Sequence, residues 1–290
     1  MQRTLLCFGL GYTAERLVRR LLGAGWRGRG TARDPARLEA LARLGVEALP
    51  FERGRPLPGA AFEGVTHVLS SVPPDDDGDP VFDEHQAHLR RVPWLGYLSS
   101  TAVYGDQRGA WVDASTPVAL LPPPGPRGRA RLLAETDWRA LGAHVFRLAG
   151  LYGPGRSALD AVRAGRARRL DKPGHVFSRI HVDDVVTALI AALDRPAPGG
   201  VWDLADEAPS PHAEVVAYAC ELLGVPPPPL EPWTEAAPTL SPGLLEFYAE
   251  CRRVSGAGTR TALGVSLAYP DHRAGLRAIL EAEARERPPR

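Results

Sequence analysis

The amino terminus constrains the fold more than any other part of the chain. The apolar run Arg3 to Phe8 ends in the turn Gly9-Leu10-Gly11-Tyr12-Thr13-Ala14, and apolar residues then follow at helical spacing: Leu17, Val18, Leu21 and Leu22. A strand, a glycine turn and an amphipathic helix within ~25 residues are typical of the first half of a βαβ unit. This context, more than the glycines alone, favours a parallel sheet covered by helices.

Strands and helices continue to alternate up to about residue 150. Further strands are expected at 26–31, 65–72, 94–99 and 144–148, and helices after Asp34-Pro35 and at 82–91 and 129–141. The repeated pattern predicts an α/β protein with a Rossmann-type, doubly wound parallel sheet. Residues 1–150 would form this domain.

Beyond Gly150 the chain is punctuated by proline and glycine, for example at 196–200, 226–229 and 238–243. Helical spacing recurs at 185–193, 212–223 and 273–283. Residues 151–290 are therefore predicted to form a small C-terminal α+β lobe.

Composition excludes several classes of partner. The 35 Lys+Arg against 34 Asp+Glu give a net charge of +1, so no overall charge draws the chain to nucleic acid or membrane. No apolar run approaches the ~20 residues that span a bilayer, and no signal-peptide pattern is present, so we expect a cytoplasmic protein. Cys7, Cys220 and Cys251 lie far apart, and no spacing of Cys or His predicts a metal site or a disulfide.

Four segments, in order, resemble the extended short-chain dehydrogenase/reductase family, the NAD-dependent epimerase/dehydratase group. They are the glycine turn, Leu98-Ser99-Ser100-Thr101-Ala102-Val103-Tyr104-Gly105, Phe146-Arg147-Leu148-Ala149-Gly150-Leu151-Tyr152-Gly153-Pro154-Gly155, and Arg179-Ile180-His181-Val182-Asp183-Asp184-Val185. The resemblance implies a Rossmann domain that binds NAD or NADP, interleaved with a small substrate lobe. We expect an unidentified small-molecule substrate and allow for a homodimer.

The chain departs from this family at the catalytic positions. Arg127 stands where the resemblance places the catalytic tyrosine, and Arg131 stands where it places the lysine. The oxygen-binding serine is retained as Ser100, and Tyr104 is the nearest phenol in the sequence. Ser100, Tyr104 and Arg131 are therefore the catalytic candidates, and the usual proton relay is absent.

The cofactor candidates begin at the glycine turn. Gly9 and Gly11 would let a pyrophosphate reach the N–H groups of the helix, with Tyr12, Thr13 and Ala14 alongside. Thr13 could contact phosphate or simply cap the helix.

Cofactor choice depends on the end of the second strand. Thr31 and Arg33 stand where a 2′-phosphate is accommodated, which favours NADP(H), with NAD as the alternative. Asp34 could accept from a ribose, but its place before Pro35 favours an N-cap. Ser70, Ser71 and Val72 end another strand, where the serines could lie near the adenosine ribose or only satisfy local backbone groups.

Two functions stay open. The chain could be an atypical oxidoreductase, or it could be a dinucleotide-binding sensor or scaffold that has lost turnover. The five cations between Arg163 and Lys172 could bind an anionic substrate or form a solvated helix face.

Overall fold

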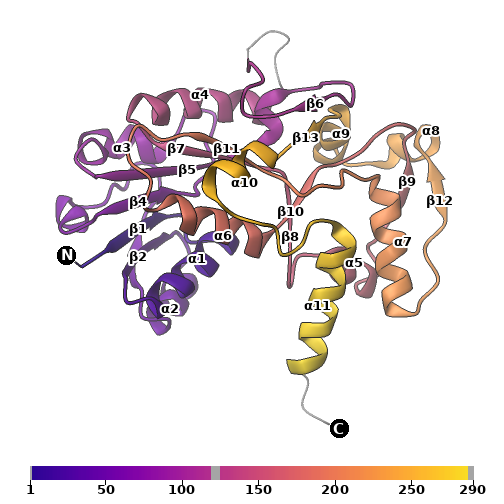
Figure 1. The fold of residues 1–290 in the computed structure, drawn as a ribbon, viewed down its shortest axis with the longest axis horizontal. Coiled ribbons are helices and arrows are strands. Elements are labelled where there is room, and N and C mark those ends of the chain that lie inside the picture. The colour runs from indigo at the N-terminus through magenta and orange to yellow at the C-terminus, as the bar shows by residue number, and fades with distance from the viewer. Residues whose placement is uncertain (1, 119–124, 287–290) are drawn as a thin grey trace.

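The main feature of the computed structural model, which describes residues 2–118 and 125–286, is one seven-stranded sheet (Figure 1). Every neighbouring pair of strands in this sheet is parallel, in the order β3-β2-β1-β4-β5-β7-β11. The strands are β1 (Thr4–Phe8), β2 (Arg27–Ala32), β3 (Glu47–Pro50), β4 (His67–Ser70), β5 (Trp94–Ser100), β7 (His144–Leu148) and β11 (Val201–Leu204). The predicted Rossmann-type, doubly wound fold is confirmed.

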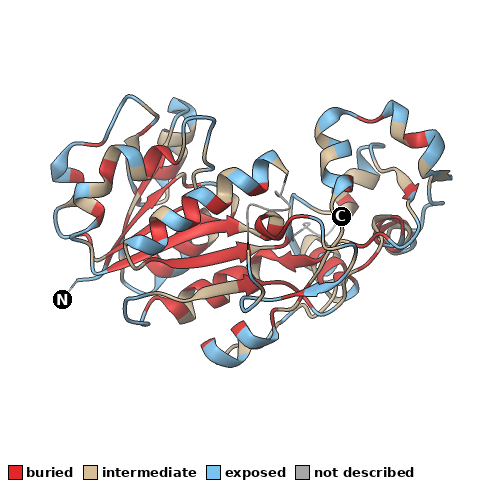
Figure 2. Ribbon diagram, turned by 90° about the horizontal axis from the view of Figure 1, so that it is seen from above, coloured by how far each residue is buried: buried red, intermediate tan, exposed pale blue. Residues whose placement is uncertain are grey.

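Helices cover both faces of the sheet, and each face has its own apolar cluster. One cluster includes α1 (Tyr12–Gly23), α2 (Pro35–Arg43) and α6 (Val182–Ala192), and the other includes α3 (Pro80–Leu89) and α4 (Pro126–Ala140). In Figure 2 the buried strands run between these helical layers.

Strand β1 shows why the sequence folds this way. All five of its residues are buried, because a parallel sheet is covered on both faces. Leu5 and Cys7 belong to one apolar cluster and Leu6 and Phe8 to the other, as the two-residue period of a strand requires.

Three two-stranded parallel sheets lie outside the main sheet, β8 with β10, β9 with β12, and β6 with β13. Helices α5, α7 and α11 pack around a separate apolar cluster. The remaining elements are β6 (Trp111–Val112), β8 (Gly150–Tyr152), α5 (Ala158–Arg163), β9 (Arg169–Asp171), β10 (Arg179–His181), α7 (His212–Leu223), β12 (Leu230–Pro232), α8 (Trp233–Ala236), α9 (Pro242–Ala249), β13 (Arg253–Val254), α10 (Ala257–Leu263), α11 (His272–Glu286), and the 3₁₀ turns η1 (Gly59–Phe62), η2 (Thr101–Tyr104) and η3 (Ala237–Thr239).

The strand β11, at one edge of the main sheet, lies beyond residue 150 in the sequence. Helix α6 precedes it and returns the chain from the smaller lobe to the main sheet. Within the described ranges, no helix combines the length and the apolar character needed to cross a bilayer.

Candidate functional site

The turn between β1 and α1 is held against two neighbouring strands. Gly9 has a φ of +71°, a left-handed conformation that favours glycine, and a Cβ there would lie 2.9 Å from Cγ2 of Val72. The N–H of Gly9 donates to Oγ1 of Thr31 at 2.9 Å. At Gly11 a Cβ would meet only the carbonyl oxygen of Gly9, at 3.8 Å. The turn therefore has a fixed side at Gly9 and an open side at Gly11.

The open side exposes the amino end of α1. Gly11 is the N-cap and gives the first-turn N–H groups no side-chain acceptor. Thr13 and Ala14 are buried, and the phenol of Tyr12 donates to the carbonyl of Pro154 at 3.0 Å, so none of these three side chains lines a cavity at the turn. The amino end of α1 therefore presents backbone N–H groups and the positive end of the helix dipole, and both favour binding of an anion.

A cavity of about 740 Å³ lies beside the turn, and we call it the glycine cavity. Both turn glycines line it, and so do Thr31, Arg33, Ser71 and Val72. Ser70 does not, because its side chain is fully buried, and its hydroxyl has no hydrogen-bond partner among the described residues. The structure thus brings six predicted cofactor residues together at the carboxyl edge of the sheet, where doubly wound folds bind ligands.

Two guanidinium groups stand on the wall of the glycine cavity. Arg33 is exposed there, and no carboxylate among the described residues lies within ion-pair distance of it. Asp34 accepts from the N–H of Ala36 at 3.1 Å and caps α2, as its position before proline suggested. Arg37, which we did not predict, lies in the first turn of α2 and pairs with Glu15 at 2.5 Å. Its place in the first turn of the helix expected after Asp34-Pro35 was the available signal for it.

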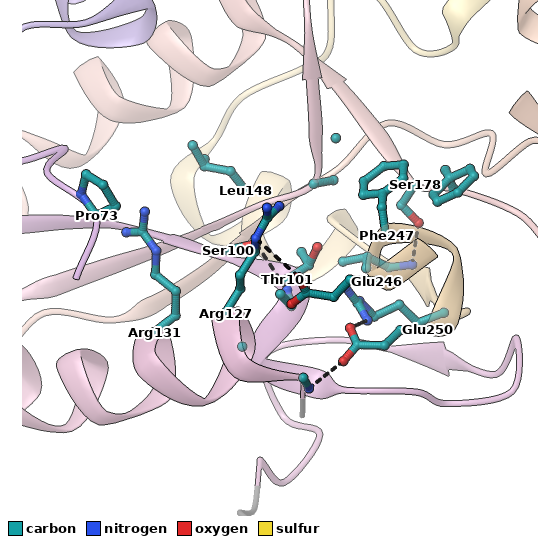
Figure 3. Close-up of a pocket in the computed structure, with 18 of the residues that line it drawn as sticks. Pro73, Ser100, Thr101, Arg127, Arg131, Leu148, Ser178, Glu246, Phe247 and Glu250 are labelled. Carbon is teal, nitrogen blue, oxygen red and sulfur yellow. Dashed lines mark hydrogen bonds and ion pairs between the residues drawn. The ribbon is translucent and has the colours of Figure 1, made fainter. Parts of the chain in front are cut away.

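A second cavity, of about 610 Å³, lies between the main sheet and the smaller lobe, and we call it the cleft (Figure 3). Its wall comes from η2, the start of α4, the end of β7 and α9. Pro73 and Pro74 line both the cleft and the glycine cavity. A ligand that extends from the glycine turn past these prolines would therefore enter the cleft.

The two arginines at the family's Tyr and Lys positions both line the cleft, one helical turn apart on α4 (Figure 3). Arg131 donates to the carbonyl of Leu98 at 2.6 Å and to the phenol oxygen of Tyr97 at 3.1 Å. Arg127 is exposed, and its Nε lies 3.6 Å from a carboxylate oxygen of Glu246. Arg131 is thus fixed by the backbone of β5, whereas Arg127 is held only loosely.

The structure separates the other two catalytic candidates. Ser100 lines the cleft, and its Oγ accepts from the N–H of Ala102 at 3.2 Å. Tyr104 does not line the cleft: its ring is buried, and its hydroxyl lies 2.8 Å from both the carbonyl of Asp113 and a carboxylate oxygen of Asp203. The expectation that Tyr104 offers a phenol to the substrate is therefore corrected, because η2 turns this side chain into the interior.

Tyr104 belongs to a buried charged network under the sheet edge. Arg147 pairs with Glu135 at 2.7 Å, each side chain 2% exposed, and also donates to the Tyr104 oxygen at 2.9 Å. Burial raises the pKa of Asp203 to about 6, although the hydrogen bond from Tyr104 and the nearby positive charge of Arg147 both lower it. This network fixes β5, β7, β11 and α4 to one another.

Helix α9 forms the opposite wall of the cleft. Phe247 stacks on Phe177 with ring centres 4.5 Å apart and planes at 10°. The carboxylate of Glu250 accepts from the N–H of Gly125, the N-cap of α4, at 2.7 Å and from Arg252 at 2.6 Å. The contact between Glu250 and Gly125 joins residues 125 positions apart, and no local pattern in the sequence indicated it.

The five cations between Arg163 and Lys172 do not line the cleft. Arg163 pairs with Glu283 at 2.6 Å and Arg168 with Glu231 at 2.5 Å. Their charges are therefore compensated within the lobe. Among the described residues, no three His, Cys, Asp or Glu side chains converge to hold a metal ion.

The fold and the two cavities define a class, that of Rossmann-type proteins built like NAD-dependent epimerases and dehydratases. The structural neighbours belong to this extended group, as the sequence motifs indicated. One is UDP-glucuronic acid 4-epimerase from Bacillus cereus in complex with NAD, 14% identical, TM-score 0.73, with 97% of this chain and 99% of that one covered. A human epimerase family protein with NADPH is 17% identical, with a TM-score of 0.69, over 96% and 99% of the chains. These two likenesses show the fold.

The chain belongs to the same family as a conserved protein of unknown function from Silicibacter pomeroyi. The two are 45% identical, with a TM-score of 0.89, over 97% of this chain and 99% of that one. No protein-family model matches the sequence.

Two curated relatives share part of the chain. A 3-diazoavenalumate denitrifying reductase from a Streptomyces species is 34% identical over 157 residues, which cover 50% of this chain and 49% of the reductase. Protein YeeZ of Escherichia coli is 33% identical over 153 residues, 50% of this chain and 51% of YeeZ. The chain thus spans about half the length of the curated relatives it matches.

Proposed function

We propose that this protein binds NADP(H) and catalyses a reduction of a small molecule without the tyrosine and lysine of the family. The observation that carries the proposal is the pair of cavities joined at Pro73 and Pro74, one at an open helix terminus and the other beside Ser100 and Arg131. An NADP-type cofactor fits the donors present, because the turn offers N–H groups for a pyrophosphate and Arg33, which forms no ion pair within the described part of the chain, offers a charge for a further phosphate.

Different residues of the glycine cavity would bind different parts of the dinucleotide. The backbone from Gly9 to Ala14 would bind the pyrophosphate, and Arg33 the 2′-phosphate. Thr31 fixes the turn through its contact with Gly9, and Ser71 and Val72 form the wall on the side of β4. When bound, the nicotinamide supplies or accepts a hydride.

The residues of the cleft limit the proton chemistry. A guanidinium keeps its proton throughout the pH range in which proteins fold, so Arg127 and Arg131 cannot act as general bases. Arg131, held by Leu98, can stabilise negative charge that develops on a substrate, and the hydroxyl of Ser100 can donate to a substrate oxygen. Proton transfer typically contributes ~10²- to 10⁴-fold, so we expect slow turnover unless the substrate needs no such transfer.

The comparison with curated proteins supports a reductase. One relative, 34% identical over half of this chain, is named a 3-diazoavenalumate denitrifying reductase. We infer the same reaction class here, with a substrate of its own.

Cofactor choice is tested at Arg33. Arg33→Ala should cost about 1.5 to 3 kcal/mol of NADPH affinity and leave NADH affinity unchanged, because only NADPH carries the 2′-phosphate. Arg43→Ala is the control, since Arg43 is an exposed arginine at the far end of the helix that follows Arg33, and among the described residues its ion-pair partner is exposed Glu39. Calorimetric titration of both dinucleotides measures the effect. Equal weakening of both, or a wild-type preference for NADH, would refute the role of Arg33.

The alternative function is a sensor or scaffold that binds the dinucleotide without turnover. The replacement of both relay residues by Arg127 and Arg131 favours it. Incubation of NADPH-bound protein with carbonyl and diazo compounds separates the two functions. Oxidation of NADPH that depends on the protein supports the reductase, and its absence across the panel supports the sensor.

A further inference from the structure

The charges that line the cleft are unequal. Among the residues that the structure describes, four guanidinium groups stand on its wall, and two carboxylates, Glu246 and Glu250, face them. Arg252 is neutralised by Glu250 at 2.6 Å, and Arg127 lies 3.6 Å from Glu246. The other two guanidiniums, those of Arg131 and Arg156, have no carboxylate within ion-pair distance among the described residues. The cleft is therefore electropositive, which favours an anionic ligand.

The positive charge is concentrated on α4. Arg127 and Arg131 rise from the same face of this helix into the cleft (Figure 3). At 3.6 Å, the contact of Arg127 with Glu246 is longer than a hydrogen bond, so its N–H groups remain available to a better acceptor. Guanidinium groups on one face of a helix can donate together to an anionic group such as a carboxylate.

The opposite wall of the cleft is apolar and aromatic. Phe247 is 50% exposed, although an aromatic ring of this size gains free energy from burial. One face of its ring is covered by Phe177 in a parallel stack. Leu148, Val176 and Val254 continue the apolar wall. This wall offers a flat surface to a planar ligand.

We infer that the substrate is a small planar carboxylic acid, an aromatic or conjugated one. Its ring lies against Phe247 and its carboxylate on Arg127 and Arg131. This inference rests on the proposed function, because it names the substrate class of the same cleft. It gives Arg127 a task that suits a permanently charged group, binding an anion, in place of the proton transfer that it cannot perform.

Calorimetry with cinnamate as the probe tests the inference. NADPH is titrated first, and cinnamate is then titrated into the NADPH-saturated protein. Cinnamamide lacks the charge and 3-cyclohexylpropanoate lacks the planar ring, so each should bind about tenfold more weakly than cinnamate, or worse. UDP-glucose, an anion of another class, should also bind more weakly than cinnamate.

Variants locate the binding groups. Arg127→Gln should weaken cinnamate about tenfold or more, and Phe247→Ala by roughly two- to tenfold, while NADPH affinity stays the same. Arg129→Gln on α4 and Leu245→Ala on α9 are matched controls, because both residues are exposed and neither lines the cleft. The controls should bind cinnamate as wild type does.

The outcomes separate this inference from the proposed function. If NADPH binds but cinnamate does not, or if cinnamamide or UDP-glucose binds as tightly as cinnamate, the substrate class is wrong and the cofactor proposal stands. If no nicotinamide dinucleotide binds, the proposed function itself fails. An unchanged cinnamate affinity in Arg127→Gln would also overturn the inference, whether or not Phe247→Ala folds.

Discussion

At the scale of single residues, two acceptors, the carbonyl of Asp113 and the carboxylate of Asp203, compete for the one phenol proton of Tyr104. The hydroxyl of Tyr104 lies 2.8 Å from the carbonyl of Asp113 and 2.8 Å from the carboxylate of Asp203, and it also receives an N–H of Arg147. While Asp203 is ionised, Tyr104 is the donor to both acceptors. Once Asp203 takes up a proton, it can donate to Tyr104, and Tyr104 can donate to Asp113 alone. This arrangement agrees with the pKa of Asp203, which burial raises to about 6.

Asp203→Asn should therefore change the pH dependence of stability. The folded state holds the proton of Asp203 more tightly than the unfolded chain does, so the wild-type protein loses stability as pH rises from about 4 to about 6. Asparagine cannot ionise. The stability of Asp203→Asn relative to wild type should therefore grow by about 1 to 2 kcal/mol between pH 4.5 and pH 8.

Urea unfolding of both proteins at the two pH values measures this growth. Glu135→Gln is the control, because it removes the carboxylate that pairs with buried Arg147 and should destabilise the protein at both pH values. A relative stability of Asp203→Asn that stays constant with pH would show that Asp203 is ionised in the folded protein at pH 4.5.

At the scale of elements, α11 is fixed to the lobe by the close approach of its backbone to β8. A Cβ at Gly275 would overlap the ring and hydroxyl of Tyr152, which donates to the carbonyl of Asp271 at 3.2 Å. No flexible neighbour can yield there, because both Gly275 and Tyr152 are buried.

Gly275→Ala should therefore destabilise the protein by about 1 to 3 kcal/mol, as overpacking does. Gly258→Ala on α10 should have the opposite sign, a gain of about 0.4 to 1 kcal/mol, because a Cβ there meets nothing within 4 Å and alanine reduces the freedom of the unfolded chain. Thermal unfolding of the two variants checks both signs. A Gly275→Ala protein as stable as wild type would mean that α11 can move away from β8 at little cost.

The sequence predicts elements well where local periodicity defines them. The helix expected at 212–223 is α7 with the same bounds, and the strand at 144–148 is β7. The strand expected at 65–72 is confined to His67–Ser70, and α4 begins at Pro126, three residues before the expected 129. Both differences lie at ends of elements, which capping and tertiary contacts decide.

The site was predictable only where one segment supplies it. The glycine turn and Arg33 come from the first βαβ unit, and they line one cavity. Tyr104 was misplaced because its distance of four residues from Ser100 says nothing about which way η2 turns a side chain. Phe247 and Glu250 were not found, because their part in the cleft depends on packing between α9 and α4, which no spacing in the sequence records.

At the scale of the whole molecule, the account depends on one arrangement. The glycine cavity and the cleft both lie at the carboxyl edge of a doubly wound sheet and share Pro73 and Pro74 as lining residues. The reductase, the sensor and the substrate class all require a dinucleotide in the glycine cavity. A homodimer stays a prediction, and none of these proposals depends on it.

Calorimetric titration of NADPH into wild-type protein and into Gly11→Val tests that requirement most directly. A Cβ at Gly11 meets only the carbonyl of Gly9, at 3.8 Å, and points into open space, so Gly11→Val should stay folded, with its free energy of unfolding within about 1 kcal/mol of wild type. We predict that wild type binds NADPH and that Gly11→Val shows no binding, because the valine side chain occupies the place of the pyrophosphate. Failure of folded wild-type protein to bind any nicotinamide dinucleotide, or equal binding by Gly11→Val, would contradict the account.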